Sequence, residues 1–146
     1  MNHTPHAPLD VLVIDDDDVA AEGILRSLRK CPMPMTCTTA QDGVEGLQIL
    51  RGQHPEKTIE HPHLVLLDLN MPRMGGLEFL SHLRADEALH KTVVFVLSTS
   101  SRDADVAESY HQNVAGYMVK SKLGPQFACL SELLTSYGRS VSLPSG

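Results

Sequence analysis

Five short apolar runs alternate with segments of helical character along this chain of 146 residues. The runs lie at 11–14, 35–40, 64–67, 93–97 and 116–119. The first, third and fourth are continuous blocks of aliphatic and aromatic side chains, as is typical of parallel strands buried on both faces. Helices are predicted at 19–29, 43–50, 76–84, 103–111 and 125–137. These repeated β–α units predict a doubly wound α/β fold, with helices on both faces of a five-stranded parallel sheet.

The length of the chain and the continuity of this pattern predict one domain, at residues 9–138. The residues on either side, 1–8 and 139–146, are expected to form flexible tails. The longest linker without periodicity, at 51–63, lies inside the domain. The remaining length leaves no room for a second domain.

Composition argues against several classes of function. The net charge of −6 disfavours binding to nucleic acid or to anionic membranes, and no cluster of Lys and Arg opposes that conclusion. No apolar stretch approaches the roughly 20 residues of a membrane span, and the N-terminus does not resemble a signal peptide. Three scattered cysteines are too few for a disulfide framework. We therefore expect a cytoplasmic protein.

Acidic residues follow two of the predicted strands. Four consecutive aspartates, 15–18, come directly after the first apolar run, and Asp68 comes directly after the third. Clustered carboxylates repel one another unless a cation or solvent screens them. For Asp17 and Asp18 we favour a simple role at a helix N-terminus. Asp15, Asp16 and Asp68 are instead expected to form a site for a hard cation, with one reactive carboxylate.

The carboxyl ends of the other strands carry further candidate groups, because function gathers at this edge of an open parallel sheet. Ser98 ends the fourth run and Lys120 follows the fifth. Two carboxylates and a backbone carbonyl suit Mg²⁺, which prefers few protein ligands. Asp68 is a candidate nucleophile toward a phosphoryl group, with Lys120 neutralising charge and Ser98 donating a hydrogen bond.

Four segments resemble the motifs of response-regulator receiver domains, the phosphoacceptors of two-component signalling. They are VLVIDD at 11–16, LLDLNMPRMGG at 66–76, VLST at 96–99 and GYMVK at 116–120. The likeness extends over about residues 9–137, with each motif at a predicted strand end. It implies a flavodoxin-like sheet with strand order 2-1-3-4-5.

The resemblance also implies roles for individual residues. Asp68 would be phosphorylated, and Asp15, Asp16 and the main-chain carbonyl of Asn70 would hold Mg²⁺ beside it. Ser98 and Lys120 would bind the phosphoryl group.

Tyr117 would change rotamer with Ser98 as the conformational switch. The alternative for Tyr117 is a plain aromatic residue on an edge strand.

The chain departs from the family pattern at two positions. Ser121 stands where a cis proline usually follows the lysine, and a cis bond before a non-proline residue costs about 3 kcal/mol. The Lys120–Ser121 peptide is therefore either cis or trans, and the placement of Lys120 depends on which. Gly75 replaces a common acid, and we expect this to affect only the loop and the following helix cap.

The implied partner is a sensor histidine kinase or a phosphotransfer protein. A looser likeness extends to receivers that are paired with bacterial phytochromes. An apolar series on the last helix also suggests a homodimer or partner surface on the face of the fourth helix, fifth strand and fifth helix, unless that series belongs to the core. The series is Phe127, Leu130, Leu133, Leu134 and Tyr137, with Met118 and Leu123 near the sheet edge.

Three other functions are compatible with a fold of this class. A pseudo-receiver that is never phosphorylated would act as an interaction module, but it would be expected to lack an acid or the lysine. An aspartyl-phosphate phosphohydrolase would usually carry a second acid where Asn70 stands. A flavodoxin-like cofactor site would need a phosphate-binding loop after the first strand, and the four aspartates there would repel a phosphate. We therefore expect a phosphoacceptor rather than an enzyme acting on other substrates.

Overall fold

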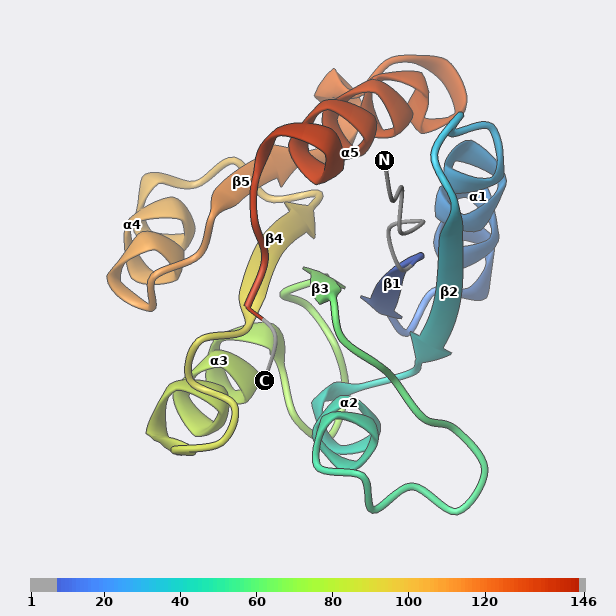
Figure 1. Cartoon of the computed structure of the whole chain (residues 1–146). Coiled ribbons are helices and arrows are strands. Elements are labelled where there is room, and N and C mark those ends of the chain that lie inside the picture. The colour runs from blue at the N-terminus through green and yellow to red at the C-terminus, as the bar shows by residue number, and fades with distance from the viewer. Residues whose placement is uncertain (1–7, 145–146) are drawn as a thin grey trace, which may run out of the picture.

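A single five-stranded parallel sheet organises the molecule, and helices cover both of its faces (Figure 1). The computed structural model describes residues 8–144. The strands are β1 (Leu9–Ile14), β2 (Met35–Ala40), β3 (His63–Leu67), β4 (Val93–Ser98) and β5 (Gly116–Val119). The helices are α1 (Asp18–Arg29), α2 (Gly43–Leu50), α3 (Gly76–Ala85), α4 (Asp103–His111) and α5 (Ala128–Ser140).

The strands lie in the order β2-β1-β3-β4-β5, and all neighbours are parallel. The predicted fold class and strand order are therefore confirmed. Every residue of β3 is buried, which explains why all of them but His63 are apolar. Because the chain leaves β1 for β2 on one side and later crosses to β3 on the other, the carboxyl ends of β1 and β3 flank the switch point of the sheet.

Two apolar clusters, one on each face of the sheet, form the core. Alternate residues of β1 divide between them, with Leu12 on the face that packs against Phe79 of α3. Val11 lies on the opposite face, where it packs with Ile24 of α1 and Leu130 of α5. All five of these side chains are fully buried. The helices therefore hold the strands rigidly from both sides, and the loops at the strand ends project from a fixed frame.

The last helix differs most from the prediction. We expected it to start at Pro125, but Pro125–Phe127 form a short 3₁₀ turn and α5 begins at Ala128. Gln126 and Phe127 both have φ near +56°, a left-handed conformation that an α-helix cannot include. The sequence shows no sign of this break, because Pro125 is a normal first residue of a helix.

The boundaries of the domain were expected at residues 9 and 138. In the structure α5 continues to Ser140, and Leu143 packs against the cluster that contains Leu130. Part of the expected C-terminal tail is thus ordered against the core. Of the expected N-terminal tail, residues 1–7 lie outside the described residues, as do residues 145–146 at the other end.

Candidate functional site

The carboxyl edge of the sheet brings the predicted site residues together from four strands. Asp15 and Asp68 directly follow β1 and β3, Ser98 ends β4 and Lys120 follows β5. Backbone pairing continues through both acids. The Asp68 N–H donates to the Ile14 carbonyl at 2.9 Å, and the Asp15 N–H donates to the Ala40 carbonyl at 3.0 Å. The two carboxylates are therefore fixed by the sheet rather than carried on a loose loop.

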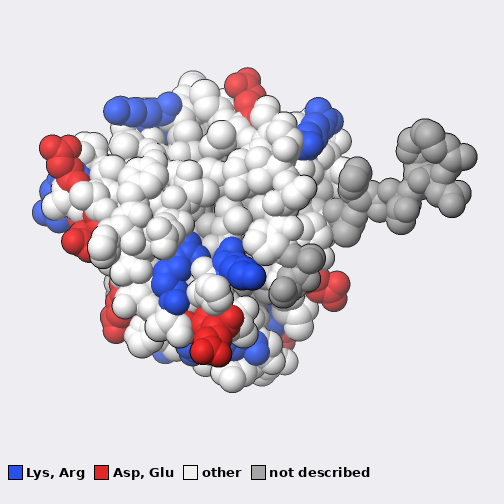
Figure 2. All heavy atoms as spheres, turned by 60° about the vertical axis from the view of Figure 1, so that its left-hand side comes forward, with Lys and Arg blue, Asp and Glu red and all other residues white. Residues whose placement is uncertain are grey.

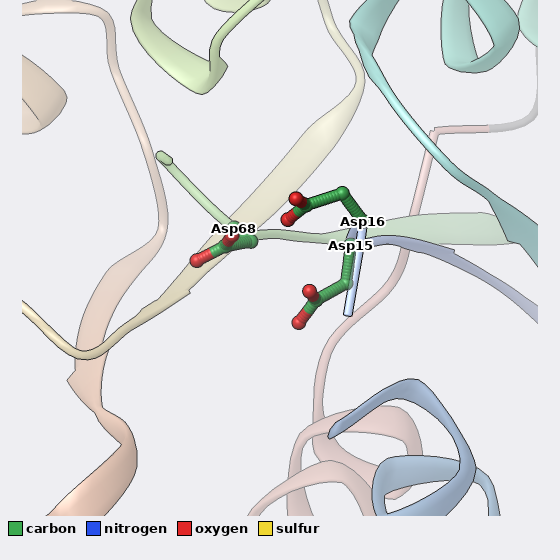
Figure 3. A group of neighbouring side chains, drawn as sticks. All are labelled: Asp15, Asp16 and Asp68. Carbon is green, nitrogen blue, oxygen red and sulfur yellow. The ribbon is translucent and has the colours of Figure 1, made fainter. Parts of the chain in front are cut away.

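Three carboxylates converge at this edge. One oxygen each from Asp15, Asp16 and Asp68 lies within 4.8 Å of the other two. Figure 3 shows the carboxylates of Asp15 and Asp16 directed to the side on which Asp68 lies. Asp15 and Asp68 are buried, whereas Asp16 is exposed. Among residues 8–144 this is the single group of three or more acidic, His or Cys side chains with such spacing. Hard oxygen donors in this arrangement fit a divalent cation, which would offset their mutual repulsion.

Lys120 supplies positive charge to the same cluster. Its Nζ lies 2.8 Å from Oδ2 of Asp15 and 3.7 Å from Oδ1 of Asp68, and only 13% of its side chain is exposed. The Lys120–Ser121 peptide is trans, since the one cis bond within residues 8–144 is His61–Pro62. Lys120 therefore reaches the acids without the usual cis proline.

Burial raises the pKa of Asp68 from 3.8 to about 6, and the neighbouring charges of Asp15 and Asp16 add to the rise. Lys120 and a backbone hydrogen bond from Asn70 oppose it. A carboxylate with a raised pKa holds its negative charge at a cost in free energy. A cation or a bond to an electrophilic phosphorus atom would reduce the free-energy cost of this negative charge on Asp68.

The remaining aspartates of the run have a structural role. Asp17 caps α1, because its Oδ1 accepts hydrogen bonds from the N–H groups of Val19 and Ala20 at 2.9 and 3.2 Å. Asp18 lies in the first turn of α1, where the helix dipole favours an acid. The simple interpretation of these two residues is confirmed.

Ser98 and Tyr117 are linked through one residue of the β4–α4 loop. The Ser98 hydroxyl, which is completely buried, accepts the N–H of Ser100 at 3.1 Å. The Tyr117 hydroxyl donates to the carbonyl of the same Ser100 at 2.8 Å. A displacement of the Ser98 side chain would therefore act on Ser100, the residue whose carbonyl holds Tyr117.

Three contacts at this edge were not found from the sequence. The Ser100 hydroxyl donates to Asp105 of α4, and Arg102 binds the same carboxylate at 3.2 Å. On the other loop, Nε of Arg73 donates to Oδ2 of Asp42 at 2.7 Å. A serine two residues after Ser98 carried no signal, and the partner of Arg73 is 31 residues away in the chain.

The loop that carries Asn70 ends at Gly75, which occupies the N-cap of α3 without a side-chain hydrogen bond. The departure from the family pattern at Gly75, where an acid is common, thus lies at the helix cap, as expected. Asn70 itself is exposed, two residues beyond Asp68. Its main-chain carbonyl remains the fourth predicted protein ligand, beside Asp15, Asp16 and Asp68.

The apolar series on α5 divides between core and surface. Leu130 and Leu134 are fully buried, and Leu123 is 8% exposed. Leu133 is 37% exposed, and Tyr137 packs edge-on against Phe95 with ring centroids 5.0 Å apart. The core interpretation is therefore right for most of the series, and Leu133 is its main surface residue.

A flavodoxin-like sheet whose carboxyl edge joins three acids, a buried hydroxyl and a lysine defines a class of phosphate-accepting signalling domains. Residues 11–126 match the family model described as the response regulator receiver domain. The chain belongs to this family, and the predicted membership is confirmed. It is a receiver domain of two-component signalling, and the rival functions are not favoured.

Individual relatives support the same assignment. The chain is 27% identical over 146 residues to the response regulator Rcp1 of Synechocystis, with 99% of each chain covered. The structure of the Mn²⁺-bound form of Rcp1 matches with a TM-score of 0.81 at 27% identity, covering 94% of this chain and 99% of that one. The phosphorylated cyanobacterial phytochrome response regulator RcpA matches with a TM-score of 0.85 at 29% identity, covering 95% and 100%.

The acid cluster and the Mn²⁺-bound relative together fit divalent metal binding of the kind found in receiver domains. Within residues 8–144, no helix has the length and apolar character that crossing a membrane requires.

Proposed function

We propose that Asp68 is the phosphoacceptor of this receiver domain. The observation that carries the proposal is the meeting of Asp68 with Asp15, Asp16 and Lys120 at one edge of the sheet. An oxygen of Asp68 attacks the phosphorus atom of the donor, the bond from phosphorus to the donor breaks, and an acyl phosphate forms on Asp68. The donor keeps the electron pair of the broken bond.

Asp15, Asp16, Asp68 and the main-chain carbonyl of Asn70 hold Mg²⁺ in this proposal. The bound ion offsets negative charge on the carboxylates and on the transferring oxygens. Asp15 keeps its place through its own contacts, since its Oδ1 accepts the Asp17 N–H at 2.9 Å and its Oδ2 binds Lys120. Magnesium is the natural choice among hard divalent ions for a site with few protein ligands and room for water.

Lys120 and Ser98 then bind oxygens of the phosphoryl group. Lys120 lies between Asp15 and Asp68, so that a small shift of Nζ brings it to a phosphoryl oxygen on Asp68. Ser98 leaves the N–H of Ser100 when its hydroxyl turns toward the phosphoryl group. Tyr117 follows because its hydroxyl is bound to the Ser100 carbonyl, and this change is the signal.

The proposed donor is a sensor histidine kinase or a phosphotransfer protein in the cytoplasm. The likeness to Rcp1 and RcpA supports a bacterial phytochrome as the kinase. Figure 2 shows basic and acidic side chains interspersed over one face, without a continuous basic patch. A protein partner therefore suits this surface better than nucleic acid. The only reactions proposed are phosphotransfer to Asp68 and hydrolysis of the resulting acyl phosphate.

The face formed by α4, β5 and α5 is the proposed contact with a second copy or with a partner. Tyr110 of α4 is 49% exposed, and Leu133 of α5 is the other large exposed apolar residue of these elements. Met118 on the edge strand β5 is partly buried against the core cluster that contains Leu130. Sedimentation at micromolar concentration tests this surface. A strict monomer with and without phosphorylation would leave only a transient contact.

Incubation with acetyl phosphate and Mg²⁺, followed by intact mass measurement, tests the central proposal. The protein should gain one phosphoryl group, and Asp68→Asn should gain none. Asp18→Ala is the matched control, because Asp18 is also an acid of this edge but lies outside the cluster. Full labelling of Asp68→Asn would refute the assignment.

A further inference from the structure

The β3–α3 loop, residues 69–75, is fastened to the start of α2. The Met74 carbonyl accepts the N–H of Gly43 at 3.2 Å, and the Leu69 carbonyl accepts the N–H of Gly76 at 2.9 Å. A Cβ added at Gly43 would lie 2.8 Å from Cγ of Met74. The loop and the first turn of α2 are thus in direct contact, with no space for a larger residue between them.

An ion pair joins the same two segments. Arg73 donates from Nε to Oδ2 of Asp42 at 2.7 Å, while Oδ1 of Asp42 accepts the N–H of Glu45 at 2.9 Å and caps α2. The side chain of Asp42 is 8% exposed and that of Arg73 is 62% exposed. Arg73 has φ of +61°, a left-handed conformation that a non-glycine residue adopts at some cost. A contact that holds the loop in this conformation must offset that cost.

The capping role of Asp42 accounts for one of its two oxygens only. The second oxygen engages Arg73, which within residues 8–144 forms no other ion pair and no hydrogen bond or ion pair with Asp68. Arg73 lies three residues after Asn70, in the short loop between the end of β3 and Gly75. The pair therefore acts on a segment of the proposed metal site that no strand holds.

We propose that the Asp42–Arg73 pair is a positioning element for the metal site. It limits the conformations of the β3–α3 loop and so presents the Asn70 carbonyl at a constant place. The pair thereby raises the affinity for divalent cations and the rate of phosphorylation of Asp68. This inference rests on the proposed function, since it concerns the same site.

Two substitutions separate this role from helix capping. Asp42→Asn keeps an N-cap side chain of equal size, because Asn caps helices about as well as Asp, but it removes the charge. Arg73→Met keeps most of the apolar stem and removes the guanidinium. Each should weaken Mg²⁺ binding about 10-fold, at the lower end of what the loss of an outer contact costs a metal site. The double variant should be no weaker than either single variant.

Arg51→Met is the matched control. It breaks another Arg–Asp contact, Arg51 to Asp86 at 3.2 Å, which lies at the opposite end of α2. Mg²⁺ affinity by titration calorimetry should be unchanged in this variant. Arg73→Lys should recover most of the affinity, because an ammonium group still reaches the carboxylate of Asp42.

The melting temperature without metal serves as the second measurement. If Arg73→Met lowers it and leaves Mg²⁺ affinity unchanged, the pair is only structural and the proposal is wrong. Phosphorylation of the unsubstituted protein by acetyl phosphate is measured in parallel. A chain that fails to label refutes the proposed function, whereas one that labels and is insensitive to Arg73→Met refutes this inference alone.

Discussion

The two loops that flank Asp68 are held in different ways. The β3–α3 loop is fastened to α2 by the Arg73–Asp42 pair and by Gly43, groups that the phosphoryl chemistry does not use. The β4–α4 loop is held partly by Ser100 and Arg102, which bind Asp105 of α4. Its other contacts run through Ser98 and Tyr117, the groups proposed to change partners on phosphorylation. The first loop is thus a fixed support, whereas some contacts of the second would be exchanged by phosphorylation.

This contrast has a physical basis. A metal ligand must stay within a few tenths of an ångström of its place, so its loop gains from contacts that are independent of the ligand. A switch needs two arrangements of similar free energy, so its contacts must be few and replaceable. Ser100 meets the second requirement, because single hydrogen bonds join its peptide groups to Ser98 and Tyr117.

The largest expected effect is a difference in Mg²⁺ affinity between variants of the acid cluster and variants of the β4–α4 loop. Asp16→Ala should weaken Mg²⁺ binding about 100-fold, since it removes a proposed ligand from the cluster. Ser98→Ala should leave Mg²⁺ binding almost unchanged, because Ser98 belongs to the switch side. Calorimetric titration measures both, with Asp18→Ala as the control. Equal losses in Asp16→Ala and Asp18→Ala would mean that the acids act as a diffuse cluster.

A second test uses the raised pKa of Asp68 in the metal-free protein. Between its unfolded pKa of 3.8 and its folded pKa of about 6, the folded state binds the proton more tightly. The contribution of Asp68 to stability therefore falls as pH rises through this window and is constant above it. Asp68→Asn should stabilise the protein at pH 7.5 by about 2 kcal/mol, below the roughly 3 kcal/mol of the full shift, because water still reaches this carboxylate.

Urea unfolding in the presence of a chelator measures this effect. The gain in free energy of unfolding from Asp68→Asn should shrink as the pH falls from 6 to 4 and should vanish below pH 4. Addition of Mg²⁺ should stabilise the unsubstituted protein more than the variant, because the ion binds the folded state. An advantage that is independent of pH would contradict the raised pKa.

Amide hydrogen exchange tests which loop moves. Phosphorylation should change exchange rates about 10-fold at residues 98–103 and at Tyr117, where contacts are exchanged. Residues 72–75 of the fastened loop should change little, and so should Ala40 and Leu47 in the core. Changes spread evenly over the molecule would contradict a localised switch.

The smallest expected effect concerns Ser100. Ser100→Ala removes the hydroxyl that binds Asp105 and should cost about 1 kcal/mol of stability, the usual net value of such a hydrogen bond. Mg²⁺ affinity should not change, in contrast to Arg73→Met on the other loop. A comparable loss of metal affinity in both variants would mean that the two loops are not independent.

The sequence was a good guide to the elements and to the reactive groups, and a poor guide to what holds them. All five strands and five helices were predicted, with the main error at the start of α5, where Gln126 and Phe127 adopt a left-handed conformation. Asp15, Asp16, Asp68 and Lys120 were predicted to meet, and the structure places them together.

The sequence by itself determined the fold and the chemical character of the site, because apolar periodicity and strand-end residues are local patterns. A strand of Leu and Val that ends in aspartate must deliver that acid to the edge of a parallel sheet. Only the tertiary structure decided that Lys120 binds Asp15 more closely than Asp68, that Arg73 pairs with Asp42, and that Ser100 connects Ser98 to Tyr117. These contacts join separate elements, and their distances depend on how the helices pack against the sheet rather than on any spacing along the chain.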